Sequence, residues 1–301
     1  MKLFLKLIQN RNLILISALI FGFLLPEGSG ITKNYTLYIL AAVMTFSMTG
    51  IHLKLLKDYK TTLKVSAEAV FLNFILQAVI LLGISYFIFD KETFNGFVVI
   101  AATPPGVAVI PFTYTFKGDL NYSFRAVLGT YLISIFLTPL ILYIFSEGII
   151  LDPMIIVGVI IKIIVIPLIL SRLLLIKKIL PITEKVRGKV VDWGFALIIY
   201  TAIAVNRNLI LNDYVTVLKT AGILFLSLFV TGILYLYFNR KKPDKKLIIS
   251  KKLILTVKSS GFAIALALIL FKPKSAVPAA VLSIFVLLWL ISLNIYYSRK
   301  N

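Results

Sequence analysis

Long apolar runs, each followed by a short polar connection, recur along the whole chain. A transmembrane helix needs about 20 consecutive, mostly apolar residues to cross a hydrocarbon core about 30 Å thick. Hydrophobic residues make up 60% of the 301 residues and charged residues 15%, whereas about a quarter of the residues of a soluble domain are charged. The sequence therefore predicts an all-α polytopic membrane protein that forms one unit over residues 1–301. We expect ten transmembrane helices, at residues 12–26, 35–54, 65–89, 94–116, 122–146, 149–171, 190–206, 214–238, 252–271 and 275–297.

The positive charges predict how these spans are oriented. Lysine and arginine gather in alternate connections, above all in 54–64, 172–189 and 240–252, while the opposite connections contain few of them. Basic residues are retained on the cytoplasmic side, so we expect a multi-pass protein of the plasma (inner) membrane with both termini in the cytoplasm. The net charge of +20 comes from these scattered residues rather than from a continuous basic stripe, so no nucleic-acid partner is expected.

One apolar run, residues 94–116, contains helix breakers at its centre. Thr103 is followed by Pro104, Pro105 and Gly106, and Pro111 comes soon after. Proline removes a backbone donor and clashes with the preceding turn, so we expect a broken helix. Unpaired backbone groups at membrane depth are tolerated only where protein or water satisfies them, and secondary transporters bind their solutes at such interruptions. A simple proline kink in a spanning helix is the alternative.

The run at 252–271 is the counterpart of this segment in the second half of the chain. It contains Lys258-Ser259-Ser260-Gly261. Hydroxyl groups and a permissive glycine suit an unwound helix, but they suit a surface for close helix packing equally well. Five expected spans on either side of residues 147 and 148 predict two inverted repeats, about 1–147 and 148–301. The segments that follow Phe116-Lys117 and Phe271-Lys272 are weakly similar, which supports a duplication only slightly.

Few acidic or metal-binding side chains lie inside the expected spans. Nearly all of the twelve acidic residues fall in connections or at span ends. Glu68, about one turn inside the third span, can pair with Lys64 or reach the interface. The chain has no cysteine and a single histidine, His52. We therefore expect no metal site and no cofactor, and an enzyme that acts on lipid is poorly supported.

Three lysines fall deep within expected spans. Lys162 has no polar neighbour in the sequence, and Lys219 can extend outward to the interface. Lys258 alone lies beside hydroxyl groups in an expected helix break. Because a charge in hydrocarbon usually faces the protein interior or a cavity, Lys258 is the strongest functional candidate. The alternative is that Lys258 merely extends to the cytoplasmic interface.

Several motifs make the chain similar to a known family. The segments 44–50, 113–119, 260–267 and 277–279, with Ser123 and Thr138-Pro139, resemble the bile acid/sodium symporter family. The resemblance implies ten helices: a panel of helices 1, 2, 6 and 7, and a core of helices 3–5 and 8–10. It also implies that helices 4 and 9 cross where they are broken, and that the protein transports a solute. The auxin efflux carriers of the same superfamily are the nearest competitor, since Pro104-Pro105 resembles their fourth helix, and they imply a permease or facilitator.

The chain departs from this family at the positions that bind sodium. Where the family has oxygen-bearing side chains, this sequence has Val109, Ile110, Val127 and Ile254. Lys258 and Ser259 replace a family glutamine and asparagine. A hard cation needs several oxygen ligands, so we expect transport without sodium, with Lys258 in the place of the ion. Proton coupling is the alternative that a lysine can supply.

These observations favour a secondary transporter that moves a small organic anion across the membrane by alternating access. The anion preference rests on Lys258 and on the positive N-terminal ends of half-helices. A channel or sensor that descends from transporters is the remaining alternative. The expected partners are the solute and the lipid bilayer, and the oligomeric state is left open. The residues expected to bind solute or couple ions are Thr103, Pro104, Pro105, Gly106, Thr113, Ser123, Lys258, Ser259, Ser260, Gly261 and Asn73.

Overall fold

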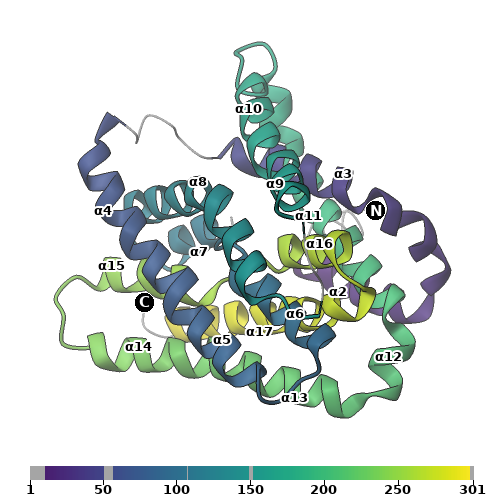
Figure 1. The fold of residues 1–301 in the computed structure, drawn as a ribbon. Coiled ribbons are helices and arrows are strands. Elements are labelled where there is room, and N and C mark those ends of the chain that lie inside the picture. The colour runs from purple at the N-terminus through teal and green to yellow at the C-terminus, as the bar shows by residue number, and fades with distance from the viewer. Residues whose placement is uncertain (1–10, 51–56, 107, 149–151, 299–301) are drawn as a thin grey trace.

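The computed structural model describes residues 11–50, 57–106, 108–148 and 152–298, and helices dominate this part of the chain (Figure 1). Six helices of the described residues are long and apolar enough to cross a membrane. A seventh span results if the bent pair Leu13–Leu24 and Pro26–Met48, whose axes differ by 96°, is counted as one. An all-α polytopic membrane protein is thus confirmed, while ten spans in two inverted repeats stay a prediction.

The six spans follow the expected order along the chain, and three of them contain a π-helical segment. Two begin six or more residues earlier than the sequence predicted, at Tyr59 instead of 65 and at Leu180 instead of 190. The spans and their elements are Tyr59–Ser85 (α4 Tyr59–Val70, η3 Phe71–Leu76, α5 Gln77–Ser85), α8 Leu120–Phe145, Met154–Leu173 (α9 Pro153–Ile160, η4 Ile161–Val165, α10 Ile166–Leu173), α11 Leu180–Val205, Tyr214–Asn239 (α13 Tyr214–Phe225, η5 Leu226–Val230, α14 Thr231–Asn239) and Pro273–Tyr297 (η6 Pro273–Ala276, α17 Val277–Ser298).

Aspartate side chains begin many of the helices. Each of these carboxylates accepts a hydrogen bond from a backbone N–H in the first turn of its helix. Such caps satisfy donors that a helix leaves free, and a negative charge is favourable at this end of the helix dipole. Half of the chain's twelve acidic residues therefore cap the N-termini of helices. The capping residues are Asp58 of α4, Asp90 of α6 (Lys91–Ala102), Asp119 of α8, Asp152 of α9, Asp213 of α13 and Asp244 of α15 (Lys245–Thr256).

The helices pack in two groups. On the right of Figure 1, α11 lies along α2 (Arg11–Leu24) and α3 (Ser29–Met48), and α10 packs on α3. Arg172 of α10 donates a hydrogen bond to the carbonyl oxygen of Met48, one of the last residues of α3. On the left, α4 packs against α8, while α6 contacts α5, α8 and α17. The short helices η1 (Pro26–Gly28) and α12 (Arg207–Asn212) follow α2 and α11.

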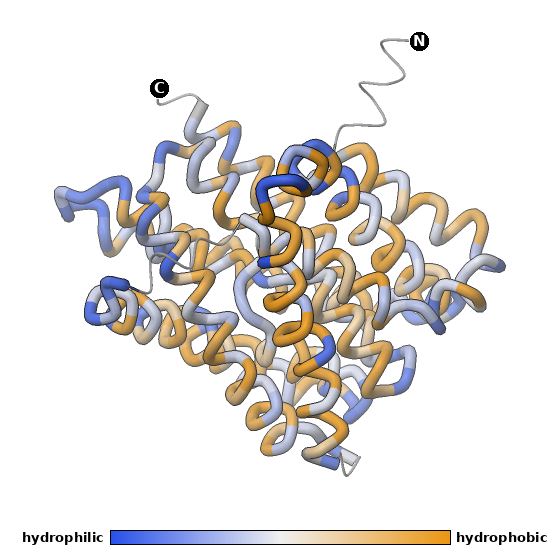
Figure 2. The backbone as a smooth tube through the Cα atoms, turned by 90° about the horizontal axis from the view of Figure 1, so that it is seen from above, coloured by the Kyte–Doolittle hydropathy of each residue, from blue (hydrophilic) through white to orange (hydrophobic). Residues whose placement is uncertain are grey.

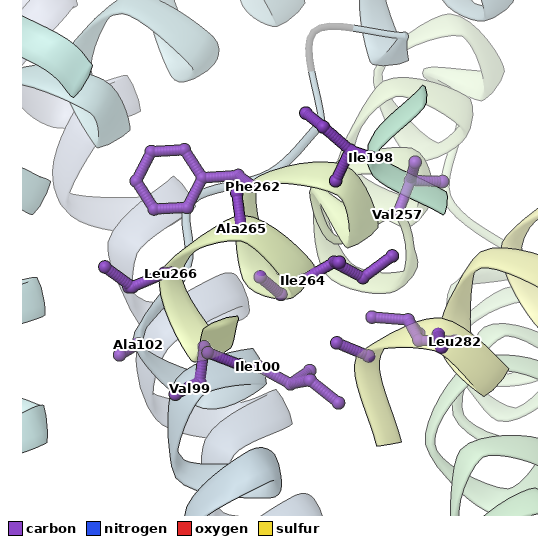
Figure 3. Close-up of a cluster of buried hydrophobic side chains, with 14 of the residues drawn as sticks. Val99, Ile100, Ala102, Ile198, Val257, Phe262, Ile264, Ala265, Leu266 and Leu282 are labelled. Atoms are coloured by element: carbon purple, nitrogen blue, oxygen red, sulfur yellow. The ribbon is translucent and has the colours of Figure 1, made fainter. Parts of the chain in front are cut away.

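Helix α16 (Ser260–Leu270) lies between the two groups. It contacts α3 and α11 on one side and α17 and α6 on the other. Figure 3 shows its Ile264 and Leu266 gathered with Val99 and Ile100 of α6 and Leu282 of α17, all of them fully buried. A helix that is apolar all round belongs in a protein interior. With 11 residues, α16 is too short to cross a membrane alone.

The outer surface suits a bilayer. Figure 2 shows hydrophobic residues through most of the helices, with hydrophilic residues gathered mainly at the connections. Large side chains such as Phe136, Met154 and Phe238 are at least three-quarters exposed. On a soluble protein such extended apolar surface is rare, whereas lipid-facing helices present it as a rule.

Candidate functional site

The predicted interruption of the fourth expected span is present. Helix α6 ends at Ala102, and α7 (Val109–Thr115) begins after a non-helical stretch that contains Thr103, Pro104, Pro105 and Gly106. The two prolines lack the N–H groups that a continuous helix would need. Residues 94–116 are therefore not one kinked helix.

The ninth expected span is interrupted as well, and the two interruptions cross. Helix α15 ends at Thr256, and α16 begins at Ser260. The stretch between them runs antiparallel to the first interruption, with a bridge between Pro105 and Lys258. Gly106 N–H donates to the Val257 carbonyl over 2.9 Å, and Ser259 N–H donates to the Pro104 carbonyl over 3.2 Å. Each broken segment thereby satisfies backbone groups of the other, which burial in a membrane protein requires.

The side chain of Lys258 fastens this crossing. Its Nζ donates to Asn73 Oδ1 (2.9 Å) and to the carbonyl oxygens of Ala101 (2.9 Å) and Thr103 (2.8 Å). An ammonium has three donors, and all three are used by neutral oxygens. The carbonyls at the end of α6 carry the negative end of the helix dipole, which favours a cation. Lys258 is 1% exposed, so it does not extend to the interface.

Asn73 joins this arrangement from a third element. It lies in the π-helical segment η3 and is fully buried. Its Oδ1 accepts from Lys258, and its Nδ2 donates to the Ile254 carbonyl over 3.2 Å, close to the end of α15. The π-helical turns of membrane and soluble proteins frequently mark functional positions. The sequence suggested Asn73 as a candidate, but it did not reveal that Asn73 binds Lys258.

The remaining predicted residues divide into two sets. Gly106, Lys258, Ser259, Ser260 and Gly261 line one small cavity of about 50 Å³ at the crossing. A side chain at Gly261 would come within 2.2 Å of the Phe195 ring on α11, so only glycine allows this close approach.

The second set lies apart from that cavity. Thr113 and Ser123 are fully buried, and their hydroxyl oxygens are 2.8 Å apart, which ties α7 to α8. The Thr103 hydroxyl donates to the Ile100 carbonyl. The hydroxyl groups of these three side chains therefore form hydrogen bonds within their own helix or to the neighbouring helix. None of the three lines the cavity at the crossing or the larger cavity that is described next.

The larger cavity, of about 600 Å³, lies between the two groups of helices. Its walls include Ser47 and Thr49 near the end of α3 and Thr183 and Arg187 near the beginning of α11. Ala108 and Phe195 line both cavities, so this space ends against the crossing. We call it the inter-group cavity.

Sequence reasoning missed most of the inter-group cavity. Ser47 and Thr49 lie within the motif 44–50, so a signal for them existed. Arg187 lies in the basic connection 172–189, where membrane topology alone accounts for a positive charge. The acidic residues Glu184 and Asp192 also line this space.

Other charged residues differ from expectation. Glu68 forms an ion pair with Lys251 rather than with Lys64. Lys252, assigned to a basic connection, is fully buried, and its Nζ donates to the Tyr297 hydroxyl over 2.7 Å. Lys162 and Lys219 are exposed on the outer surface. Of the three lysines predicted to lie deep in spans, only Lys258 is buried among the described residues.

Three of the four apolar side chains that stand where the resemblance implies sodium ligands are part of the core. Val109, Val127 and Ile254 are fully buried, and each contributes hydrocarbon where a cation would need an oxygen.

Comparison with known proteins identifies the family. The sequence model of the sodium bile acid symporter family matches residues 37–213. This match extends from α3 to the connection after α12 and includes the first interruption. No curated protein matches the chain. Because the match covers more than half of its 301 residues, the chain belongs to the sodium bile acid symporter family, a family of membrane transporters rather than enzymes.

Proposed function

We propose that the protein is a secondary transporter that carries a small organic anion by alternating access, and that it does so without sodium. The observation that carries this proposal is the Lys258 ammonium, which is held by three oxygens where the two interrupted helices cross. In this proposal the lysine side chain supplies the positive charge that a bound sodium ion would otherwise supply.

Electrostatics supports the exclusion of sodium. Two unit charges about 4 Å apart repel by roughly 4 kcal/mol at an effective dielectric constant of 20. A sodium ion beside Lys258 would meet that repulsion, and the apolar Val109 and Ile254 side chains would offer no oxygen ligand to offset it.

The inter-group cavity is the proposed solute site. Its volume of about 600 Å³ lies within the range of roughly 300–1,000 Å³ that is usual for small-molecule sites. Ser47, Thr49 and Thr183 provide hydroxyl groups, and Arg187 provides a cation that can hold a carboxylate with two parallel hydrogen bonds. The cavity adjoins the crossing, so a solute there can influence the position of both interrupted helices.

A recurring pattern supports the inverted repeats that alternating access would need. The pattern Asp-Tyr-x-Thr-x-Leu-Lys occurs at 58–64 and again at 213–219. In both places the aspartate caps a 12-residue α-helix, which a π-helical segment and a nine-residue helix follow. In both halves the next element, α6 or α15, is a 12-residue helix that an aspartate caps and that ends at an interruption.

The test compares uptake into proteoliposomes with sodium and with choline as the external cation, over a range of pH. The solute is first chosen by a thermal-shift screen of carboxylates, because a ligand that binds the folded state raises its apparent stability. We expect equal uptake in the two cations. In Lys258→Gln we expect a lower rate and a changed pH profile, while Lys219→Gln, which alters an exposed lysine, leaves both unchanged. Strong sodium dependence of the wild type would refute the proposal.

A facilitator that resembles the auxin efflux carriers is the second candidate function. The observation that favours it is the Pro104-Pro105 pair at the crossing. A facilitator equilibrates its solute, whereas a proton-coupled transporter accumulates it against a gradient. Uptake with an imposed pH gradient distinguishes the two, and saturation with counterflow excludes a channel.

A further inference from the structure

An apolar cavity opens on the outside of the helix bundle. It lies between η3 and α5, the beginning of α6 and the end of α8, and its volume is about 540 Å³. Its walls include Ile75, Val79, Phe94, Ile141 and Phe145. The lining side chains contribute a single polar group, the hydroxyl of Tyr86. We call this cavity the apolar groove.

The rim of the apolar groove faces the surroundings of the protein. Val79 and Phe87 on this rim are 65% and 84% exposed. Val79 belongs to the span Tyr59–Ser85, so in a bilayer the groove opens into hydrocarbon. An empty apolar space would forfeit dispersion contacts along its walls. A polar headgroup would lose its water there without replacement, so the groove suits an alkyl chain and excludes the rest of a lipid.

The inner end of the apolar groove reaches the crossing. Phe74 lines the groove and is 4% exposed. The centre of its ring lies 5.0 Å from Lys258 Nζ, a distance at which the ring attracts a cation. The neighbouring residue Asn73 accepts a hydrogen bond from the same ammonium. One aromatic ring therefore separates the groove from the group that fastens the two interrupted helices.

We propose that the apolar groove binds one acyl chain of a bilayer lipid, and that this chain holds Phe74 against Lys258. The lipid belongs to the leaflet in which α5 ends and α6 begins. The binding site stands on the groove alone, while its effect on transport rests on the proposed function. The two parts are tested by separate measurements.

The chain offers a matched pair of variants for the binding test. A Cβ atom at Gly83, which lines the groove, would meet no other atom within 4 Å. The backbone at Gly83 therefore has room for a side chain, and Gly83→Phe is designed to fill part of the groove with a ring, with Gly83→Leu as a smaller version should the first fold poorly. Gly222 of α13 is equally free of neighbours and lies outside the groove, so Gly222→Phe is the control.

The probe is a phosphatidylcholine that carries a photoreactive diazirine in one acyl chain, incorporated into proteoliposomes of the full chain. We expect the labelled peptides to come mainly from residues 74–87 and 141–145 in the wild type and in Gly222→Phe. In Gly83→Phe, or in Gly83→Leu, labelling of these peptides should fall severalfold. Equal labelling of all exposed helices, or labelling that neither Gly83 variant reduces, would overturn the site.

The effect on the crossing is measured with Phe74→Leu. This change keeps the groove apolar but removes the ring beside Lys258. We expect lipid labelling to persist while the pH profile of transport shifts. If the profile is unchanged, the link to Lys258 is wrong, although the acyl-chain site would stand. Sodium-dependent uptake, by contrast, would refute the proposed function and leave the labelling result intact.

Discussion

At the scale of single residues, the ammonium of Lys258 joins three elements that are distant in the sequence. Its partners belong to η3 and to the end of α6, while the lysine itself lies between α15 and α16. A buried charge without hydrogen-bond partners would be very costly. The arrangement is therefore stable only while every partner is present, which makes each of them open to a direct test.

Asn73→Ala removes one partner from Lys258 and leaves the Ile254 carbonyl without its donor. We expect this change to destabilise the protein by roughly 1–3 kcal/mol, the usual cost of an unsatisfied buried polar group. Thermal unfolding in detergent measures it. Asn121→Ala, at an exposed position, should leave the melting temperature nearly unchanged. Equal melting temperatures for the wild type and Asn73→Ala would mean that these hydrogen bonds do not stabilise the fold.

Gly261→Ala tests the close contact between α16 and α11. The added Cβ would lie 2.2 Å from the Phe195 ring, and overpacking of this kind costs about 1–3 kcal/mol. We expect a lower melting temperature that Phe195→Leu partly restores in the double variant. Gly158→Ala meets no atom within 4 Å and serves as the control. A double variant no more stable than the single one would show that the ring is not the obstacle.

The sequence identified Lys258 because a charge beside hydroxyl groups in an apolar run is locally visible. Its partners could not be identified in the same way, since Asn73 lies 185 residues away and only the fold brings the two together. Arg187 was missed for a different reason. Basic residues at the ends of spans are so common as topology signals that one which lines a cavity looks like the others.

At the scale of elements, ion pairs connect the beginning of α6 to the segment η6. Asp90 pairs with Lys274 over 2.8 Å, and Glu92 pairs with Lys272 over 2.7 Å. The Ser275 hydroxyl donates to the Glu92 carbonyl. These contacts hold the beginning of the first interrupted helix against the beginning of the span that contains η6 and α17.

The ion pair between Asp90 and Lys274 predicts how the stability of the folded protein depends on pH. Burial alone would raise the pKa of Asp90, but hydrogen bonds from Lys274 and Thr93 lower it below its ordinary value of 3.8. The resulting stability is present above pH 3.8 and is lost as the pH falls through the lowered pKa. We expect the wild-type melting temperature to fall in this acidic range. Asp90→Asn keeps a good helix cap, and its melting temperature should fall less steeply with pH than that of the wild type. If the melting temperatures of the two proteins depend on pH in the same way, the ion pair has no such role.

The first interruption was predictable because its cause is local: Pro104-Pro105-Gly106 disfavours a continuous helix wherever it occurs. The sequence Ser259-Ser260-Gly261 suited a close-packing surface equally well, so it left the second interruption open. The beginnings of α4 and α11 were predicted too late because the N-terminal parts of both helices contain charged residues, such as Lys60 and Glu184, and therefore look like connections. Asp58 caps α4, and Pro181 occupies the first turn of α11, so both helices extend beyond the apolar run that was used to place them.

At the scale of the whole molecule, the lack of cysteine permits a clean test of orientation. Lys91 and Lys245 are exposed first residues of α6 and α15. If the two halves are inverted repeats, these positions lie on opposite sides of the membrane. Lys91→Cys and Lys245→Cys should then react with a membrane-impermeant maleimide from opposite sides. Labelling of both from one side would refute the inverted arrangement.

Hydropathy predicted a polytopic membrane protein without difficulty, because most of the surface is apolar. The number of spans is harder to predict. Six described helices qualify by length and composition, and the others are short or bent, such as α16 with its 11 residues. Short helices must combine across an interruption to cross a bilayer. The backbone pairing at Pro105 and Lys258 brings the two interruptions together, while a crossing by α6 with α7 and by α15 with α16 stays a prediction.

The Lys258 side chain stays with the polypeptide, and while its ammonium keeps its proton this has a thermodynamic consequence for the direction of flux. A carrier that releases no ion on either side gains no work from an ion gradient. The membrane potential is then the only driving force besides the solute gradient itself. A potential of 100 mV, negative inside, contributes about 2.3 kcal/mol per charge, which favours an outside concentration of a monovalent anion roughly fiftyfold above the inside one. With Lys258 as its fixed cation, a carrier of this kind would favour export of its anion over accumulation.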